Sequence, residues 1–324
     1  MVIVGWGGIS NKLGQELFSD LFATTTGGQV QWVAAPGQQV AALQAQHAAG
    51  QMEWDVANAL VGDQLAVLSQ QGLIRKLPPD LKARLEQQMP NGVTDYGVEY
   101  ATVSDVIVCN SKEVAACPKT PQDFFNVTDF PAQRSLYIGA PLVAMAMALE
   151  ADGVPPARVF PMDIDRAFRK LQAIRPSIRV FWQSGDQSEQ IFRSGEVGAS
   201  ILWNGRARDL AMHPTDRMTV EASWQGAIYE PAFTVMVNGA PHPNAAAKYL
   251  EWLVEHPDAM ARYSEQTSYG FPSLQLFKLL SDDVARWLPE YPAHFSDQVR
   301  IDHSWYLQNK GEIDSRWKEF TSAR

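Results

Sequence analysis

The sequence predicts an α/β protein that folds into two lobes. Its 324 residues are roughly twice the usual length of one domain, so two hydrophobic cores are expected rather than one. Hydrophobic residues make up 46% of the chain and charged residues 19%, a composition typical of packed globular domains rather than of disorder. Short strands alternate with helices and glycine turns, which indicates a parallel sheet with right-handed crossovers.

The charge balance and the apolar stretches exclude two classes of partner. With 27 Lys and Arg against 36 Asp and Glu, the net charge is −9, which would repel a phosphate backbone, so we expect no nucleic acid partner. The longest strongly apolar stretch, Leu142 to Leu149, is well short of the roughly 20 residues that cross a bilayer. No signal peptide is visible at Met1, which fits both a mature secreted chain and a cytosolic one.

The first lobe is expected to consist of strand–turn–helix units. In order, these are a strand at 2–4, a glycine turn at 5–8, a helix at 13–22, a strand at 30–35, a helix at 40–49 and a strand at 54–57. Ligands bind beyond the carboxyl ends of parallel strands. Trp6 and its neighbour Gly7, together with Asn58, are therefore expected at one rim of the sheet.

Two extended segments, residues 100–108 and 233–237, are expected to connect this lobe to a second one. The second lobe should contain helices at 142–149 and 164–174, a strand at 178–182, a helix that begins at 184–186 and a strand at 197–202. We expect the first lobe to span residues 1–103 and about 235–280, the second to span 104–234, and C-terminal helices at 281–324 to pack on the lobes.

A search for catalytic motifs finds none. The sequence has no GxSxG elbow, HExxH helix, Walker A loop, GxGxxG turn or EF-hand loop. Its six histidines are scattered without the spacing of metal ligands. The acidic pairs Asp163/Asp165 and Asp282/Asp283 stand beside expected helix starts, where carboxylates favour the helix dipole. We therefore predict no catalytic residue, no metal site and no cofactor.

Aromatic and polar residues gather instead at the expected strand ends, which indicates a binding cleft. They are Trp6, Tyr100, Trp203, Asn204, Gly205, Arg206, Tyr229, Glu230 and Tyr269. An aromatic ring offers area for a small solute, and a guanidinium offers a planar fork for a carboxylate. For any single tryptophan, packing in a core remains the alternative. Trp6 and Trp203 are favoured as binding residues because each stands beside glycines in an expected turn.

The two cysteines, Cys109 and Cys117, leave two interpretations open. In an oxidising compartment they can form one local bridge, and in a cytosolic protein they would be unlinked thiols.

Nine short motifs, in order, resemble one family. They are Trp6-Gly7-Gly8, Trp54-Asp55-Val56, Gly72-Leu73-Ile74, Pro121–Phe125, Phe130–Arg134, Asp163–Phe168, Trp182–Gly185, Ser194–Val197 and Trp203–Arg206. Over nearly the whole chain the sequence resembles the extracellular solute-binding proteins of ABC importers, in the branch that includes the spermidine/putrescine-binding proteins.

The resemblance implies a type II periplasmic binding fold, with two αβ lobes, crossing strands and hinge closure on a ligand in the cleft. It implies a small-molecule ligand, a membrane permease as partner, a periplasmic location and hence a Cys109–Cys117 bridge. We expect a monomer. By resemblance, Trp6 and Trp203 are aromatic walls, Ser184 and Gly185 form a polar loop, and Tyr229 to Ala232 line the floor of the cleft.

The ligand is where the sequence departs from the polyamine binders. The expected second-lobe helix begins Ala140-Pro141-Leu142-Val143, and Glu230 is the one acid on the floor, so a polyamine would lack partners for most of its charges. Arg206 favours a carboxylated solute, such as an amino acid or an aromatic acid. The alternative is that Arg206 pairs with a structural carboxylate or covers apolar surface.

Three rival functions stay open at this point. They are a polyamine-binding protein of the same family, a two-lobed αβ enzyme such as a transferase, and a binding protein whose partner is a chemoreceptor.

Overall fold

The computed structural model describes residues 1–323 and divides the chain into two compact units. Unit 1 consists of Met1–Thr102 and Pro231–Glu290, and unit 2 of Val103–Glu230 and the chain from Tyr291 onward. The chain therefore passes from one unit to the other three times. Among the described residues, no helix combines the length and the apolar character needed to cross a bilayer.

Unit 1 is built on a five-stranded mixed sheet. In spatial order its strands are β2 (Gln31–Ala34), β1 (Val2–Gly5), β3 (Val56–Val61), β10 (Ala232–Met236) and β4 (Gly97–Glu99). β1 pairs in parallel with β2 and β3, whereas β10 runs antiparallel to β3 and β4. Successive side chains of a strand point to opposite faces. Ile3 and Val4 of β1 therefore enter two different cores.

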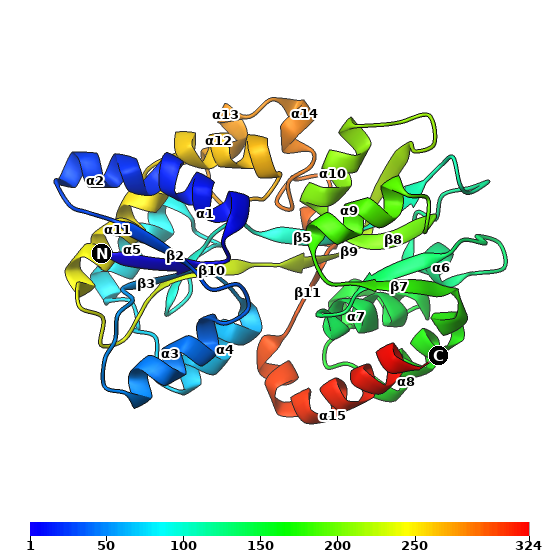
Figure 1. The fold of residues 1–324 in the computed structure, drawn as a ribbon, viewed down its shortest axis with the longest axis horizontal. Coiled ribbons are helices and arrows are strands. Elements are labelled where there is room, and N and C mark those ends of the chain that lie inside the picture. Colours follow the sequence, from blue (N-terminus) through cyan, green and yellow to red (C-terminus); the bar gives the residue numbers. More distant parts are fainter. Residues whose placement is uncertain (324) are drawn as a thin grey trace. The chain divides into compact units, whose positions relative to one another are not determined.

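Helices cover both faces of the unit 1 sheet (Figure 1). They are α1 (Gly8–Gly14), the π-helical η1 (Gln15–Ser19), α2 (Asp20–Thr26), α3 (Gln39–Ala48), α4 (Gly62–Gln70), α5 (Pro79–Gln88), α11 (Pro243–Val254), α12 (Pro257–Thr267), α13 (Leu276–Leu279) and α14 (Asp282–Ala285). The cluster around Ile3 joins the sheet to α1, α2, α5, α11 and α12. The cluster around Val4 joins it to α3 and α4.

Unit 2 is built on a six-stranded sheet. In spatial order its strands are β11 (Val299–Arg300), β9 (Val220–Glu230), β5 (Val103–Asn110), β8 (Ala199–Trp203), β6 (Arg134–Tyr137) and β7 (Ile178–Trp182). β6 runs parallel to β7 and β8, and β5 runs antiparallel to β8 and β9. The carboxyl ends of β6, β7 and β8 consequently meet at one edge of this sheet.

The helices of unit 2 again form two layers (Figure 1). They are α6 (Pro121–Phe125), α7 (Pro141–Ala151), η2 (Pro156–Arg158), α8 (Ile164–Ile174), η3 (Arg175–Ser177), α9 (Gly185–Arg193), α10 (Asn204–Met212), η4 (Phe295–Asp297) and α15 (His303–Ser322). α7, α8 and α15 share one core with the sheet, and α9 and α10 lie on the opposite face. As its position beside a helix start indicates, Asp163 caps α8 by accepting a hydrogen bond from Arg166 N.

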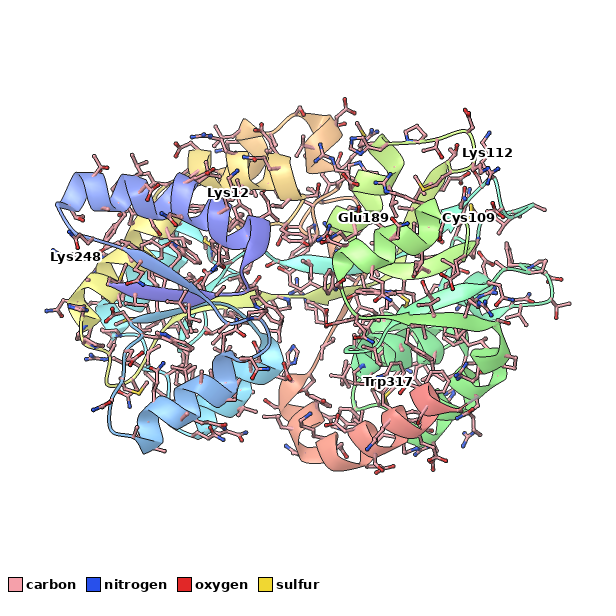
Figure 2. All side chains as sticks on the ribbon, viewed as in Figure 1. Lys12, Cys109, Lys112, Glu189, Lys248 and Trp317 are labelled. Carbon is pink, nitrogen blue, oxygen red and sulfur yellow. A yellow bond between two sulfur atoms is a disulfide. The ribbon has the colours of Figure 1, made fainter. Side chains whose placement is uncertain are left out.

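The predicted Cys109–Cys117 disulfide is confirmed, and the described residues contain no free cysteine. Cys109 lies near the end of β5 (Figure 2), so the bridge ties the following loop back to a central strand of unit 2. Closing so short a loop stabilises the fold by roughly 2.5 kcal/mol in the chain-entropy model.

Two expectations about secondary structure are corrected. Residues 203–206 are not a turn, because Asn204 begins α10 and its side-chain oxygen accepts a hydrogen bond from Ser104 N. The stretch 281–324 is not purely helical, because β11 pairs in parallel with β9. Each difference depends on a partner distant in sequence.

Candidate functional site

Three aromatic rings meet at the edge of the unit 2 sheet where the parallel strands end. Tyr137, Trp182 and Trp203 are the last residues of β6, β7 and β8. Tyr137 stacks on Trp182 with ring centroids 4.4 Å apart, and Trp203 meets both rings edge-on, at 5.3 and 5.1 Å. Trp182 is fully buried, while Tyr137 and Trp203 are partly exposed. Trp182 therefore holds two partly accessible rings in place.

Two carboxyl groups lie beside these rings. Asp105 of β5 is opposite Trp203 in the β5–β8 register. Glu230 of β9 is opposite Val103, two residues from Asp105 and therefore on the same face of the sheet. Asp105 is fully buried. Its burial, together with the charge and hydrogen bonding of Glu230, raises the pKa of Asp105 well above the ordinary value.

The same two acids affect the pKa of the Tyr137 phenol. Burial first, and then the negative charges of Glu230 and Asp105, raise the pKa of Tyr137. Trp203, Tyr137, Asp105 and Glu230 thus form one neighbourhood, which we call the aromatic–acid site. Neighbouring like charges disfavour double ionisation, which adds to burial in raising the pKa of Asp105. The site combines acidic oxygens with aromatic faces, a combination suited to an ammonium group.

Arg206 lies in the first turn of α10 and is paired within unit 2. Its Nη1 lies 2.8 Å from Oε1 of Glu189 and 3.0 Å from Oδ1 of Asp186. Glu189 lies on α9, the helix beside α10 (Figure 2). The sequence left two interpretations of Arg206 open, and this pairing matches the one in which its partner is a structural carboxylate. The two acids differ, because the side chain of Glu189 is 14% exposed and that of Asp186 is 89% exposed.

The predicted polar loop begins α9. The hydroxyl of Ser184, the N-cap residue, accepts a hydrogen bond from Gln187 N at 3.2 Å. Gly185 is buried beneath the guanidinium of Arg206. The loop therefore forms the start of α9, and its Gly185 leaves room for the guanidinium of Arg206.

In unit 1, Trp6 and Gly7 follow the carboxyl end of β1. Trp6 is partly buried, and its Nε1 donates to the carbonyl oxygen of Ala59 in β3 at 2.6 Å. Gly7 adopts a φ of 82°, a conformation that favours glycine. Asn58 is buried in β3 and accepts a hydrogen bond from Thr234 at 2.6 Å. The structure thus brings Trp6 next to β3, as parallel pairing predicts.

The remaining tyrosines of the predicted site differ in exposure. Tyr100 is fully buried, with its ring packed edge-on against Phe18 and Phe271, so it acts as a core residue of unit 1. Tyr229 is 1% exposed, and the guanidinium of Arg300 lies 4.3 Å from its ring centroid. Neighbouring side chains cover both rings, and a role of Tyr100 or Tyr229 in binding stays a prediction. Tyr269 is partly buried, and its carbonyl oxygen accepts a hydrogen bond from Ser264.

Comparison with known proteins identifies the family. Residues 18–293 match the bacterial extracellular solute-binding proteins. This chain belongs to that family. The predictions of a two-lobed periplasmic binding fold and of a substrate-binding protein of an ABC transporter are therefore confirmed.

Individual relatives support this membership of the solute-binding proteins. The chain is 27% identical to the gamma-aminobutyric acid-binding protein of Pseudomonas aeruginosa, over 99% of this chain and 91% of that protein. It is 25% identical to the spermidine/putrescine-binding periplasmic protein of Salmonella typhimurium, over 70% of this chain and 62% of that protein.

Solved structures of similar proteins agree. An ABC transporter substrate-binding protein from Bradyrhizobium japonicum is 28% identical, with a TM-score of 0.89 over 99% of this chain and 98% of that one. A GABA receptor is 30% identical, with a TM-score of 0.89 over 100% of this chain and 98% of that one.

Sequence reasoning missed Tyr137 and Asp105 of the aromatic–acid site in this solute-binding protein, and it missed Trp182, which packs against the site. Trp182 could have been predicted, because it is the first residue of a motif on which the family resemblance rests. Tyr137 was missed because the four-residue strand β6 was not recognised. Asp105 was missed because it lies inside a buried strand and gains its role from Trp203 and Glu230, about a hundred or more residues away. No group of three or more metal-ligating side chains occurs in the described part of the chain.

Proposed function

We propose that this protein captures a small amino acid in the periplasm for an ABC permease and binds the ligand's ammonium group at the aromatic–acid site. The observation that carries the proposal is the pairing of Asp105 with Glu230 beside Trp203. Two neighbouring carboxyl groups can accept hydrogen bonds from one ammonium, and aromatic faces attract the same cation.

The charge of the site favours one amine over several. In the sequence Glu230 has no acidic neighbour, and the structure adds Asp105, whose pKa is raised by burial and by Glu230. Double ionisation of the pair is therefore disfavoured, which limits the positive charge that the pair balances. A polyamine would bring two or more, and each additional ammonium would be desolvated without a partner.

Arg206 supports a carboxylate at the other end of the ligand. Its side chain is 28% exposed, and its partner Asp186 is 89% exposed. An ion pair with so exposed an acid contributes little, so a ligand carboxylate can replace Asp186 at small cost. The relatives named as gamma-aminobutyric acid binders make γ-aminobutyrate the leading candidate for the ligand.

Other parts of this proposal rest on the family. We propose that the protein is a monomer without enzymatic activity, that Trp6 and Tyr269 of unit 1 also contact the ligand, and that hinge closure presents the complex to the permease.

Calorimetric titration of four solutes tests the ligand class. γ-Aminobutyrate has both an amine and an acid, butyrate has the acid alone, putrescine has two amines, and spermidine has three. We expect γ-aminobutyrate to bind most tightly, because it alone matches both ends of the site. Putrescine or spermidine binding at least as tightly would contradict the proposal.

A further inference from the structure

Unit 2 carries a pocket outside the aromatic–acid site. Its volume is about 270 Å³, and it is formed by the start of α6, the end of α7 with the turn that follows, and one bend of β9. Its principal side chains are Pro121, Gln122, Glu150, Val154, Pro155 and Gln225. The pocket shares no residue with the aromatic–acid site, and its volume suits a ligand of only a few heavy atoms.

Glu150 provides a buried acid in this pocket. Its side chain is 5% exposed, and its Oε2 is buried without a hydrogen-bond partner. Two hydrogen bonds reach its backbone carbonyl instead, from Gln122 Nε2 at 2.7 Å and from Gly153 N at 2.9 Å. A buried carboxyl group without a partner is costly and calls for a counter-group.

Charged groups on the elements packed against α7 are engaged elsewhere. Asp123 of α6 caps its own helix, and both Arg166 and Lys170 of α8 pair with Asp152. In α15, Lys310 pairs with Asp314 and Arg316 pairs with Asp165. Two further charged residues, Arg169 of α8 and Glu221 of β9, are exposed. Within residues 1–323, Glu150 forms no ion pair with any of them. No cation of the described residues neutralises Glu150, so a bound cation can supply its counter-charge.

Gly226 shapes the wall of the pocket next to Glu150. β9 is irregular here, because Asp105 faces Ile228 whereas Ile107 faces Ser223. The extra residues bend toward α7, and Gly226 adopts a φ of 71°. A Cβ at this position would lie 3.4 Å from Oε2 of Glu150 and 2.6 Å from Cδ of Pro121. Glycine thus keeps the space beside the carboxyl group open.

The chemistry of the pocket selects an organic cation. Glu150 lies in the last turn of α7, where the helix dipole favours positive charge. A metal ion would need several oxygen or nitrogen ligands, and the described residues place no cluster of three acids, histidines or cysteines here. Proline and valine side chains instead offer apolar contact, and the amides of Gln122 and Gln225 offer hydrogen bonds.

We propose that this pocket is a second binding site, for a small primary alkylammonium ion whose charged group contacts Glu150 and whose alkyl part packs on Pro121, Val154 and Pro155. Binding requires the ionised carboxylate. Burial raises the pKa of Glu150 to about 7, so the ion displaces a proton when it binds below that pH.

Titration with n-butylammonium chloride, followed by calorimetry and by amide NMR spectra, tests this site. We expect signals of Gly226 and Gly153 to shift, and affinity to rise roughly 30-fold between about pH 5.5 and about pH 8.5 as Glu150 ionises. Glu150→Gln should abolish binding, whereas Glu221→Gln, at an exposed acid on β9, should leave it unchanged. The apparent pKa of Glu150 in the wild type should fall as butylammonium is added.

Three results would overturn the site. They are equal binding of n-butanol, binding that survives Glu150→Gln, and shifts confined to Tyr137 and Trp203. Trp203→Ala separates this inference from the proposed function, because it should weaken γ-aminobutyrate binding and leave the Gly226 shifts intact. If Glu150→Gln does not fold, the absence of any butylammonium effect on the pKa of Glu150 in the wild type contradicts the proposal equally.

Discussion

Arg206 lies directly over Gly185. The Cζ of Arg206 is 2.7 Å from the position that a Cβ on residue 185 would take, closer than real Cβ contacts allow. The absence of a side chain at the start of α9 therefore permits the guanidinium to reach Glu189 and Asp186. The predicted polar loop positions a charged group through the glycine it contains.

Gly185→Ala should destabilise the protein and weaken ligand binding. Alanine in a helix ordinarily stabilises by up to about 1 kcal/mol relative to glycine. Here we expect a net loss of about 1 to 3 kcal/mol, because the new methyl group overlaps Arg206. Gly311→Ala is the matched control, since Gly311 lies in α15 and a Cβ there would have no neighbour within 4 Å. Urea unfolding measures both variants, and stabilisation by both would mean that Arg206 moves aside without cost.

Arg206→Ala should weaken γ-aminobutyrate binding by about 2 to 5 kcal/mol, because the ligand carboxylate would be left desolvated without its partner. Arg193→Ala provides the control. Arg193 pairs with the same Glu189, at 3.6 Å, and with Asp209, at 2.8 Å. Calorimetry compares the two variants, and equal affinities would show that Arg206 has a structural role only.

Glu230→Gln and Asp105→Asn should have unequal effects. Burial and Glu230 raise the pKa of Asp105, which favours its neutral form. Asparagine mimics that neutral form, and we expect affinity for γ-aminobutyrate to change by less than about 1 kcal/mol. Glu230→Gln removes the acid that ionises more readily on this expectation and should cost about 2 to 5 kcal/mol. The opposite order of effects would assign the charge to Asp105.

Glu150 makes stability depend on pH. Its pKa is about 7 in the folded protein, against roughly 4.3 in an unfolded chain. The folded state therefore holds its proton more tightly, and stability falls as pH rises through the interval between these two values. We expect the loss to reach about 3 kcal/mol above pH 7, on the order of the full shift. Thermal unfolding should show this fall in the wild type, and Glu150→Gln should remove most of it; parallel curves for the two proteins would contradict the assignment.

Local patterns in the sequence determined much of the fold. Apolar spacing located α8 at Ile164–Ile174 and the strand β7 at Ile178–Trp182, and the acidic residues beside the expected helix start marked where α8 begins. These elements are readable because the signals lie within one or two turns of chain. Trp203 was likewise found from its place at the end of a predicted strand.

Only the tertiary structure decided how the site is composed. Asp105 reads as one polar residue inside an apolar strand, and its raised pKa depends on burial and on Glu230, which is brought alongside by antiparallel pairing of β5 and β9. In the sequence Arg206 is a cation at an expected turn. In the structure it lies on α10 and pairs with Glu189 and Asp186 of the neighbouring helix α9. Charge, unlike helix periodicity, takes its effect from distance and desolvation, and both are set by residues far apart in the chain.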